Sequence, residues 1–173
     1  MCELNSKDII TKIHEMKEIH KELKLLGNRI ADHLGVDILP IEFVELSVED
    51  SRLELKPTSK IQISDRYLTK YNKAAYCLAH GYRHVFQIYW ASIMDDDLAR
   101  LFKEDLASAK NSENINVNDN NELMEYSVQV IEVDAEAFAT YYLKKYENIE
   151  LRKKPEWFQR LIEAYIRKYK DRL

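Results

Sequence analysis

The chain has 173 residues, of which 46% are hydrophobic and 32% are charged. This length and apolar content are sufficient for one folded domain with a buried core, and they exclude a chain that is disordered throughout. Only three glycines and three prolines occur, which favours long helices over a turn-rich β-sandwich or barrel. We therefore expect a single domain over residues 1–173, of the α+β class and mostly α.

The formal net charge is −4, which provides no general attraction to nucleic acid or to anionic lipid. Acidic and apolar residues interrupt the basic residues between Arg152 and Arg172, so a solvated helix face is favoured there over a binding patch. The two cysteines, Cys2 and Cys77, are too few for a disulfide framework. The sequence shows no signal peptide and no apolar run long enough to cross a membrane. These features predict a cytoplasmic protein with no nucleic-acid or membrane partner.

Apolar residues recur every three or four positions from residue 8 to about residue 34, which predicts an amphipathic helix. Asn5 or Ser6 can cap its start, and Gly35 can end it. Three histidines lie on or near this segment: His14, His20 and His33. No two of them have the one-turn spacing of a chelating pair, so we interpret them as surface or boundary residues.

Three short segments after Pro40 have the composition of β-strands: residues 41–46, 52–56 and 60–64. The second and third alternate strictly between apolar and polar residues, which indicates one packed and one solvated face. Residues typical of turns lie near positions 49–51 and 57–59. The sequence therefore predicts a small three-stranded sheet, whose third strand leads directly into the next helix.

Helical periodicity dominates the rest of the chain. A helix that Ser64 or Asp65 can cap is predicted to run to about Trp90, and it is apolar on nearly every face, so we expect it in the middle of the domain. The acidic residues 95–97 suit the start of a further helix, a role that we prefer to a cation site because adjacent helical residues diverge. Residues 111–121 are polar and aperiodic, which predicts a mobile loop. Helices are predicted again over residues 121–146 and from Pro155 onward.

The predicted central helix contains two histidines four positions apart, His80 and His84. This spacing places both imidazoles on one helical face, one turn apart. In zinc peptidases with the H-E-x-x-H motif, a glutamate directly follows the first histidine and acts as general base. Here Gly81 takes that position. Because such a pair can also be packed or hydrogen-bonded in a core, the pair alone leaves the metal interpretation open.

A third ligand is needed, because catalytic zinc has three protein ligands and one open position. Residues 130–139 place acids among small and apolar residues, where a carboxylate is costly to bury unless it is paired or ligates a metal. Glu132 shares the apolar face of this helix, so we assign it as the third ligand. We assign Glu136, one turn further on, as acceptor for the free ring N–H of a ligand histidine. Asp134 points about 200° away from Glu132 and is the weaker candidate for the third ligand. An alternative interpretation, in which these acids face solvent, stays open.

Two motifs resemble a known family. Residues 79–87, Ala-His-Gly-Tyr-Arg-His-Val-Phe-Gln, resemble the A-H-E-x-R-H-x-x-Q active-site helix of small bacterial and phage zincin-like metallopeptidases of the gluzincin type. Residues 132–139 similarly resemble the E-x-x-A-x-x-F-A helix that carries the third zinc ligand in the ImmA/IrrE-like branch. The resemblance covers these motifs and the order of elements, and the gap between the motifs is longer here than in those relatives.

The resemblance implies a zincin fold in which a small sheet, an active-site helix and a glutamate-bearing ligand helix hold zinc. It implies zinc ligation by His80, His84 and Glu132, and a peptide or protein as substrate or partner. An extended peptide pairs with an edge strand in this fold. The strand that precedes the histidine helix is the candidate, with three residues at its centre: Ile61, Gln62 and Ile63.

Gly81 departs from the family pattern at the position of the general base. General acid–base catalysis contributes about 10²–10⁴-fold, so we predict a zinc-binding, metallopeptidase-like protein whose hydrolysis is impaired or absent. Three explanations stay open: a natural pseudoenzyme, a variant from which the base was removed, or a base supplied from elsewhere. The candidates for such a base are Glu122, Glu125 and Tyr126. The alternative function is a non-catalytic helical interaction or regulatory protein that holds a peptide or partner in the cleft.

Overall fold

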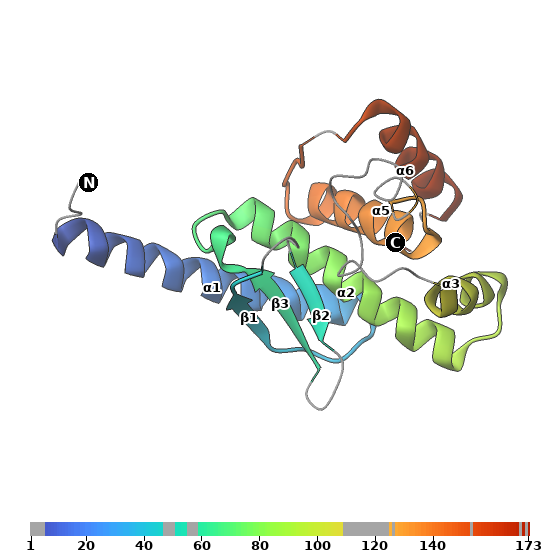
Figure 1. The fold of residues 1–173 in the computed structure, drawn as a ribbon, viewed down its shortest axis with the longest axis horizontal. Helices are drawn as coiled ribbons and strands as arrows, with labels where there is room; N and C mark the ends of the chain where they lie inside the picture. Colours follow the sequence, from blue (N-terminus) through green and yellow to red (C-terminus); the bar gives the residue numbers. More distant parts are fainter. Residues whose placement is uncertain are drawn as a thin grey trace.

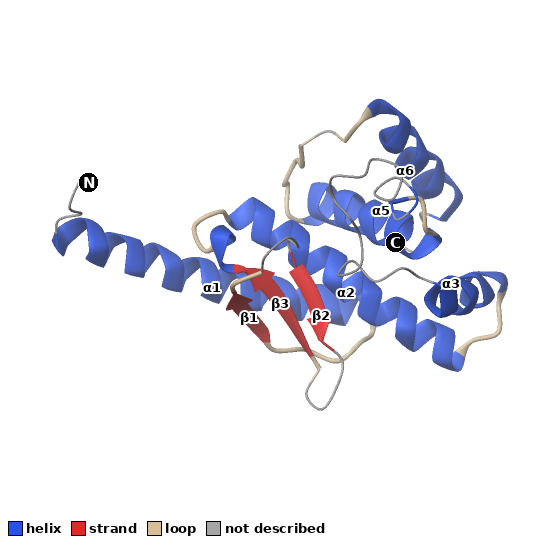
Figure 2. Ribbon diagram, viewed as in Figure 1, coloured by secondary structure: helices blue, strands red, loops and turns tan. Residues whose placement is uncertain are grey.

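The computed structural model describes residues 6–46, 51–54, 59–108, 125, 127–152, 154–169, 171 and 173. Its helices and strands, in chain order, are α1 (Ser6–Leu34), β1 (Ile41–Val44), β2 (Ser51–Glu54), β3 (Lys60–Ser64), α2 (Tyr71–Ile93), α3 (Asp97–Ser108), α5 (Val130–Tyr146) and α6 (Glu156–Tyr169). Helices predominate and one sheet is present, so the fold is α+β and mostly α, as predicted (Figure 2). The loop predicted at residues 111–121 lies outside the described residues, as do Glu122 and Tyr126.

The sheet has the strand order β1-β3-β2. β1 runs parallel to β3, with Ile41 opposite Ile61, and β2 runs antiparallel to β3, with Leu53 opposite Ile61. β3 is therefore the central strand, paired on both sides. The prediction that a peptide pairs with Ile61, Gln62 and Ile63 as an edge strand is wrong, because their backbone groups already face two neighbouring strands.

Helix α2 lies between the sheet and the C-terminal helices (Figure 1), and it contacts α1, α3, α5, β2 and β3. Its side chains are buried on most faces, as its apolar composition predicts. It begins later than predicted: residues Asp65–Tyr67 form a 3-10 turn, and Lys70, with φ −125° and ψ 71°, interrupts the helical backbone before Tyr71. Ser64 forms no capping hydrogen bond.

Helix α1 is buried only along its second half. The apolar residues of that half pack into the largest buried cluster: Leu23, Leu26, Ile30 and Ala31. Towards the N-terminus α1 extends beyond the rest of the fold (Figure 1), and Ile10 and Ile13 are exposed. Of the helices in the described part of the chain, none is both long and apolar enough to span a membrane.

Helices α3 and α5 both pack against α2. Asp96 caps α3 by accepting a hydrogen bond from the Ala99 N–H at 2.8 Å, which confirms the role predicted for the acidic triplet. α5 begins at Val130, and every side chain from Ile131 to Ala139 is buried. α6 follows Pro155 and packs on α5. The candidate site lies where α5 packs on α2.

Tyr142 of α5 is buried beside Phe138 and His33, and this burial raises the pKa of its phenol to about 12. A raised folded-state pKa stabilises the fold fully below the unfolded pKa of about 10, and this contribution is lost as the pH rises towards 12. Tyr142→Phe should therefore remove one late step from the tyrosinate absorbance titration. The protein in denaturant is the control, because all 11 tyrosines should then ionise near pH 10. Tyr76, whose pKa is also raised, keeps a late step of its own, so an unchanged number of late-ionising tyrosines in Tyr142→Phe would contradict the assignment.

Candidate metal centre

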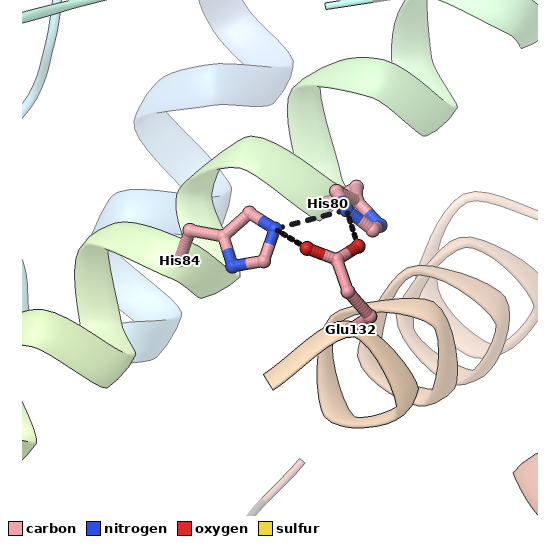
Figure 3. A group of neighbouring side chains, drawn as sticks. All are labelled: His80, His84 and Glu132. Carbon is pink, nitrogen blue, oxygen red and sulfur yellow. Dashed lines mark hydrogen bonds and ion pairs between the residues drawn. The ribbon is translucent and has the colours of Figure 1, made fainter. Parts of the chain in front are cut away.

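His80 and His84 of α2 meet Glu132 of α5 at one point (Figure 3). The two Glu132 oxygens lie 3.3 Å from His80 Nε2 and 3.4 Å from His84 Nε2, and the two Nε2 atoms are 3.0 Å apart. One potential ligand atom from each residue lies within 4.8 Å of the other two. Within the described ranges, no other cluster of three or more His, Cys, Asp or Glu side chains has this geometry. The structure thus brings together the three residues that the sequence nominated.

Local structure explains how these atoms converge. The four-residue spacing aligns the two imidazoles on one face of α2, where their ring centroids are 4.7 Å apart. Glu132 occupies the first turn of α5, and only 7% of its surface is exposed. A carboxylate buried this far needs a partner, and the two imidazoles are the partners that face it.

The second ring nitrogen of His84 has its own partner. His84 Nδ1 lies 2.8 Å from Gln87 Oε1, one turn further along α2. The Gln87 side-chain nitrogen donates to the Ile131 carbonyl at 2.8 Å and to Asp134 Oδ2 at 2.7 Å. His84 is therefore connected through Gln87 to two consecutive turns of α5.

Asp134 is paired with Arg83 and does not join the three candidate ligands. Arg83 donates from Nε to Asp134 Oδ2 at 2.7 Å and from Nη2 to Oδ1 at 2.9 Å, and both side chains are fully buried. The guanidinium also lies over the rings of Phe86, at 4.3 Å, and Phe138, at 5.3 Å. The roles of Arg83 and Gln87 were missed from sequence. A signal existed, because both are polar positions in an otherwise apolar helix.

Glu136 has different partners from those predicted. It accepts hydrogen bonds from the Tyr76 hydroxyl and from Lys154 Nζ, the latter at 2.8 Å. The predicted bond from a ligand histidine is not formed, because the charged Lys154 ammonium is a stronger donor to a carboxylate than a neutral imidazole. Nδ1 of His80 and Oε2 of Glu136 are both buried, and neither has a hydrogen-bond partner among the described residues.

The pKa values of the two histidines are shifted in opposite directions. Burial lowers the pKa of His84, and the neighbouring His80 adds to this effect, so His84 favours the neutral form in which imidazole ligates metals. Burial also disfavours the charged form of His80, but the hydrogen bond and charge of Glu132 outweigh it and raise the pKa of His80.

In addition, burial raises the pKa of Tyr76 well above its usual value, which keeps the hydroxyl available as a donor to Glu136.

Gly81 faces the sheet. A Cβ atom added at Gly81 would lie 3.3 Å from Cγ2 and 3.5 Å from Cδ1 of Ile61, a residue of the central strand β3. A side chain at this position therefore requires Ile61 to shift by a few tenths of an ångström. Of the residues considered as a replacement base, Glu125 is described and exposed.

Comparisons with protein-family models, with curated proteins and with solved structures found no match to this chain.

The donor set fits zinc. Two imidazole nitrogens and one carboxylate oxygen are the protein ligands of a common class of catalytic zinc site. The neutral form of His84, with Nδ1 facing Gln87 Oε1, is also compatible with ligation through Nε2, because a ligating imidazole carries its remaining proton on the other nitrogen. Zinc would replace the close contacts that these three side chains now make with one another.

Proposed function

We propose that this protein binds zinc through His80, His84 and Glu132 and is a metallopeptidase-like protein with impaired hydrolysis. The observation that carries the proposal is the convergence of three ligand atoms, all within 4.8 Å of one another, from two packed helices. A third ligand from a separate helix is unexpected for two histidines that merely pack in a core.

The wider arrangement supports a zincin-like interpretation of the fold. The histidine helix α2 contacts the sheet, and the glutamate helix α5 packs alongside α2, which is the order of elements that the two motifs imply. A peptide or protein is the substrate or partner that this interpretation assigns.

Zinc, when bound, supplies Lewis acidity towards a peptide carbonyl and towards water. The residues around it define what the protein can and cannot contribute. Glu132 and the two histidines would hold the cation. Tyr76 lies one turn before His80 on α2, and the rings of these two residues are 5.8 Å apart. The Tyr76 hydroxyl donates a hydrogen bond to Glu136. Gly81 offers no group that accepts a proton, so the proton transfers of hydrolysis lack their side chain.

The absence of a base at Gly81 also favours a second function, in which the protein binds a peptide or partner without cleaving it. The two functions share the metal centre and differ only in chemistry. They are therefore separated by restoring the base.

Gly81→Glu should increase zinc-dependent peptide hydrolysis by about 10²–10⁴-fold, because it restores a proton acceptor next to the ligand His80. The measurement is cleavage of a broad peptide library by the zinc-loaded variant. Gly81→Gln is the matched control, since it has the same length without a basic carboxylate, and it should stay inactive. The double variant Gly81→Glu/His84→Ala should also stay inactive.

The contact with Ile61 requires a further control. Gly81→Ala adds the Cβ atom alone. If Ile61 can move aside, the free energy of unfolding should rise by about 0.5–1 kcal/mol, the gain expected from replacing a helical glycine, and a smaller value would measure the cost of the contact with Ile61. A folded and zinc-loaded Gly81→Glu protein that cleaves no peptide would contradict the peptidase assignment and would favour the non-catalytic function.

A further inference from the structure

We infer that Gln87, Asp134 and Arg83 form a positioning chain that sets the tautomer of His84 for metal binding. This inference rests on the proposed metal centre. It goes beyond that proposal because it assigns a role to three residues that touch neither the cation nor a substrate.

The orientation of the Gln87 amide is the first step. One end of the amide lies 2.8 Å from the Ile131 carbonyl oxygen and 2.7 Å from Asp134 Oδ2, and both of these atoms are acceptors. Only the NH₂ group can satisfy two acceptors, so the nitrogen occupies this end. The carbonyl oxygen of Gln87 therefore faces His84.

The tautomer of His84 follows from that orientation. Gln87 Oε1 lies 2.8 Å from His84 Nδ1 and can only accept, so His84 Nδ1 carries a proton and donates it. Neutral His84 then has its lone pair on Nε2, the atom 3.4 Å from Glu132. This is the nitrogen that a cation at the site would use, and the protein presents it without a tautomer change.

Asp134 and Arg83 hold the amide in place. Asp134 Oδ2 accepts from both Gln87 and Arg83, and Oδ1 accepts from the second arm of the guanidinium. Arg83, Gln87 and Asp134 are each 0% exposed, so water cannot substitute for any of these bonds. A reversed Gln87 amide would place its oxygen against the Asp134 carboxylate and the Ile131 carbonyl oxygen, and both hydrogen bonds from Gln87 would be lost.

His80 provides an internal contrast. Its Nδ1 has no hydrogen-bond partner in the described part of the chain, so no comparable chain sets its tautomer. We therefore expect changes at Gln87 to alter the tautomer of His84 and to leave the tautomer of His80 unaffected.

The test compares wild-type protein with Gln87→Met, which has a similar length and no hydrogen-bonding amide. Long-range ¹⁵N–¹H spectra of the zinc-free protein, above pH 7, report the tautomer of each histidine. We expect His84 as the Nδ1–H tautomer in the wild type and as a mixture in Gln87→Met. Competition with a zinc-binding dye should show a 10–100-fold weaker affinity for zinc in Gln87→Met, in the range typical of lost support for a ligand.

Gln159→Met is the matched control, because the Gln159 amide donates a solvent-exposed hydrogen bond to Glu163 within α6, and this change should leave both readouts unchanged. An Nε2–H tautomer of His84 in the wild type would overturn the inference. So would an unchanged zinc affinity in a folded Gln87→Met protein. The Nδ1–H tautomer in a wild-type protein that binds no zinc would instead overturn the metal centre and support the hydrogen-bonded chain.

Discussion

Asp134→Ala should lower the free energy of unfolding by about 3–5 kcal/mol, the cost of leaving one member of a buried ion pair without its partner. Arg83 would lose both hydrogen bonds to a carboxylate at a position where neither side chain reaches solvent. Gln87 would lose an acceptor as well. The measurement is urea unfolding in the presence of a chelator, so that bound metal contributes nothing to the difference.

Glu156→Ala is the matched control for this prediction. Glu156 pairs with Arg160 within α6, and both side chains are more than three-quarters exposed, so its loss should cost less than about 0.5 kcal/mol. The double variant Arg83→Met/Asp134→Leu removes both charges together and should recover much of the stability lost in Asp134→Ala. A change below about 1 kcal/mol in Asp134→Ala would show that the buried pair does not connect α2 to α5 as the geometry indicates.

His84→Ala and Glu132→Ala should each abolish the stabilisation that zinc gives to the wild type. A ligand present at 100 times its dissociation constant stabilises the folded state by about 2.7 kcal/mol, and this gain disappears when a ligand side chain is removed. The measurement is the thermal unfolding midpoint with and without zinc. His14→Ala removes an exposed histidine from α1 and should keep the full zinc-induced shift. An equal shift in the wild type and in His84→Ala would place zinc at some other site.

The three candidate ligands could be predicted because each depends on local structure. The spacing of His80 and His84 determines their shared face on any helix, and the apolar neighbours of Glu132 indicate burial before any tertiary contact is known. The helical class of α5 follows from its periodicity, but the burial of every side chain from Ile131 to Ala139 does not, because the periodicity indicates only one apolar face. No knowledge of the strand order was needed for these assignments.

The incorrect predictions depend on contacts between distant segments. The alternation of β3 reveals a strand with one packed face, but it does not reveal that β1 and β2 pair with both of its edges. The partner of Glu136 is Lys154, which reaches it from the segment before α6 and takes the position expected for a histidine N–H. The burial of Arg83 likewise requires Asp134 from another helix. Such pairings arise only when the helices and strands assemble.

The metal content of the protein after purification without a chelator decides whether His80, His84 and Glu132 form a zinc site. Elemental analysis should find about one equivalent of zinc per chain in the wild type, as expected for a site with three protein ligands, and a large loss in Glu132→Ala. Less than about a tenth of an equivalent, unchanged when zinc is added back, would contradict a metal centre at His80, His84 and Glu132.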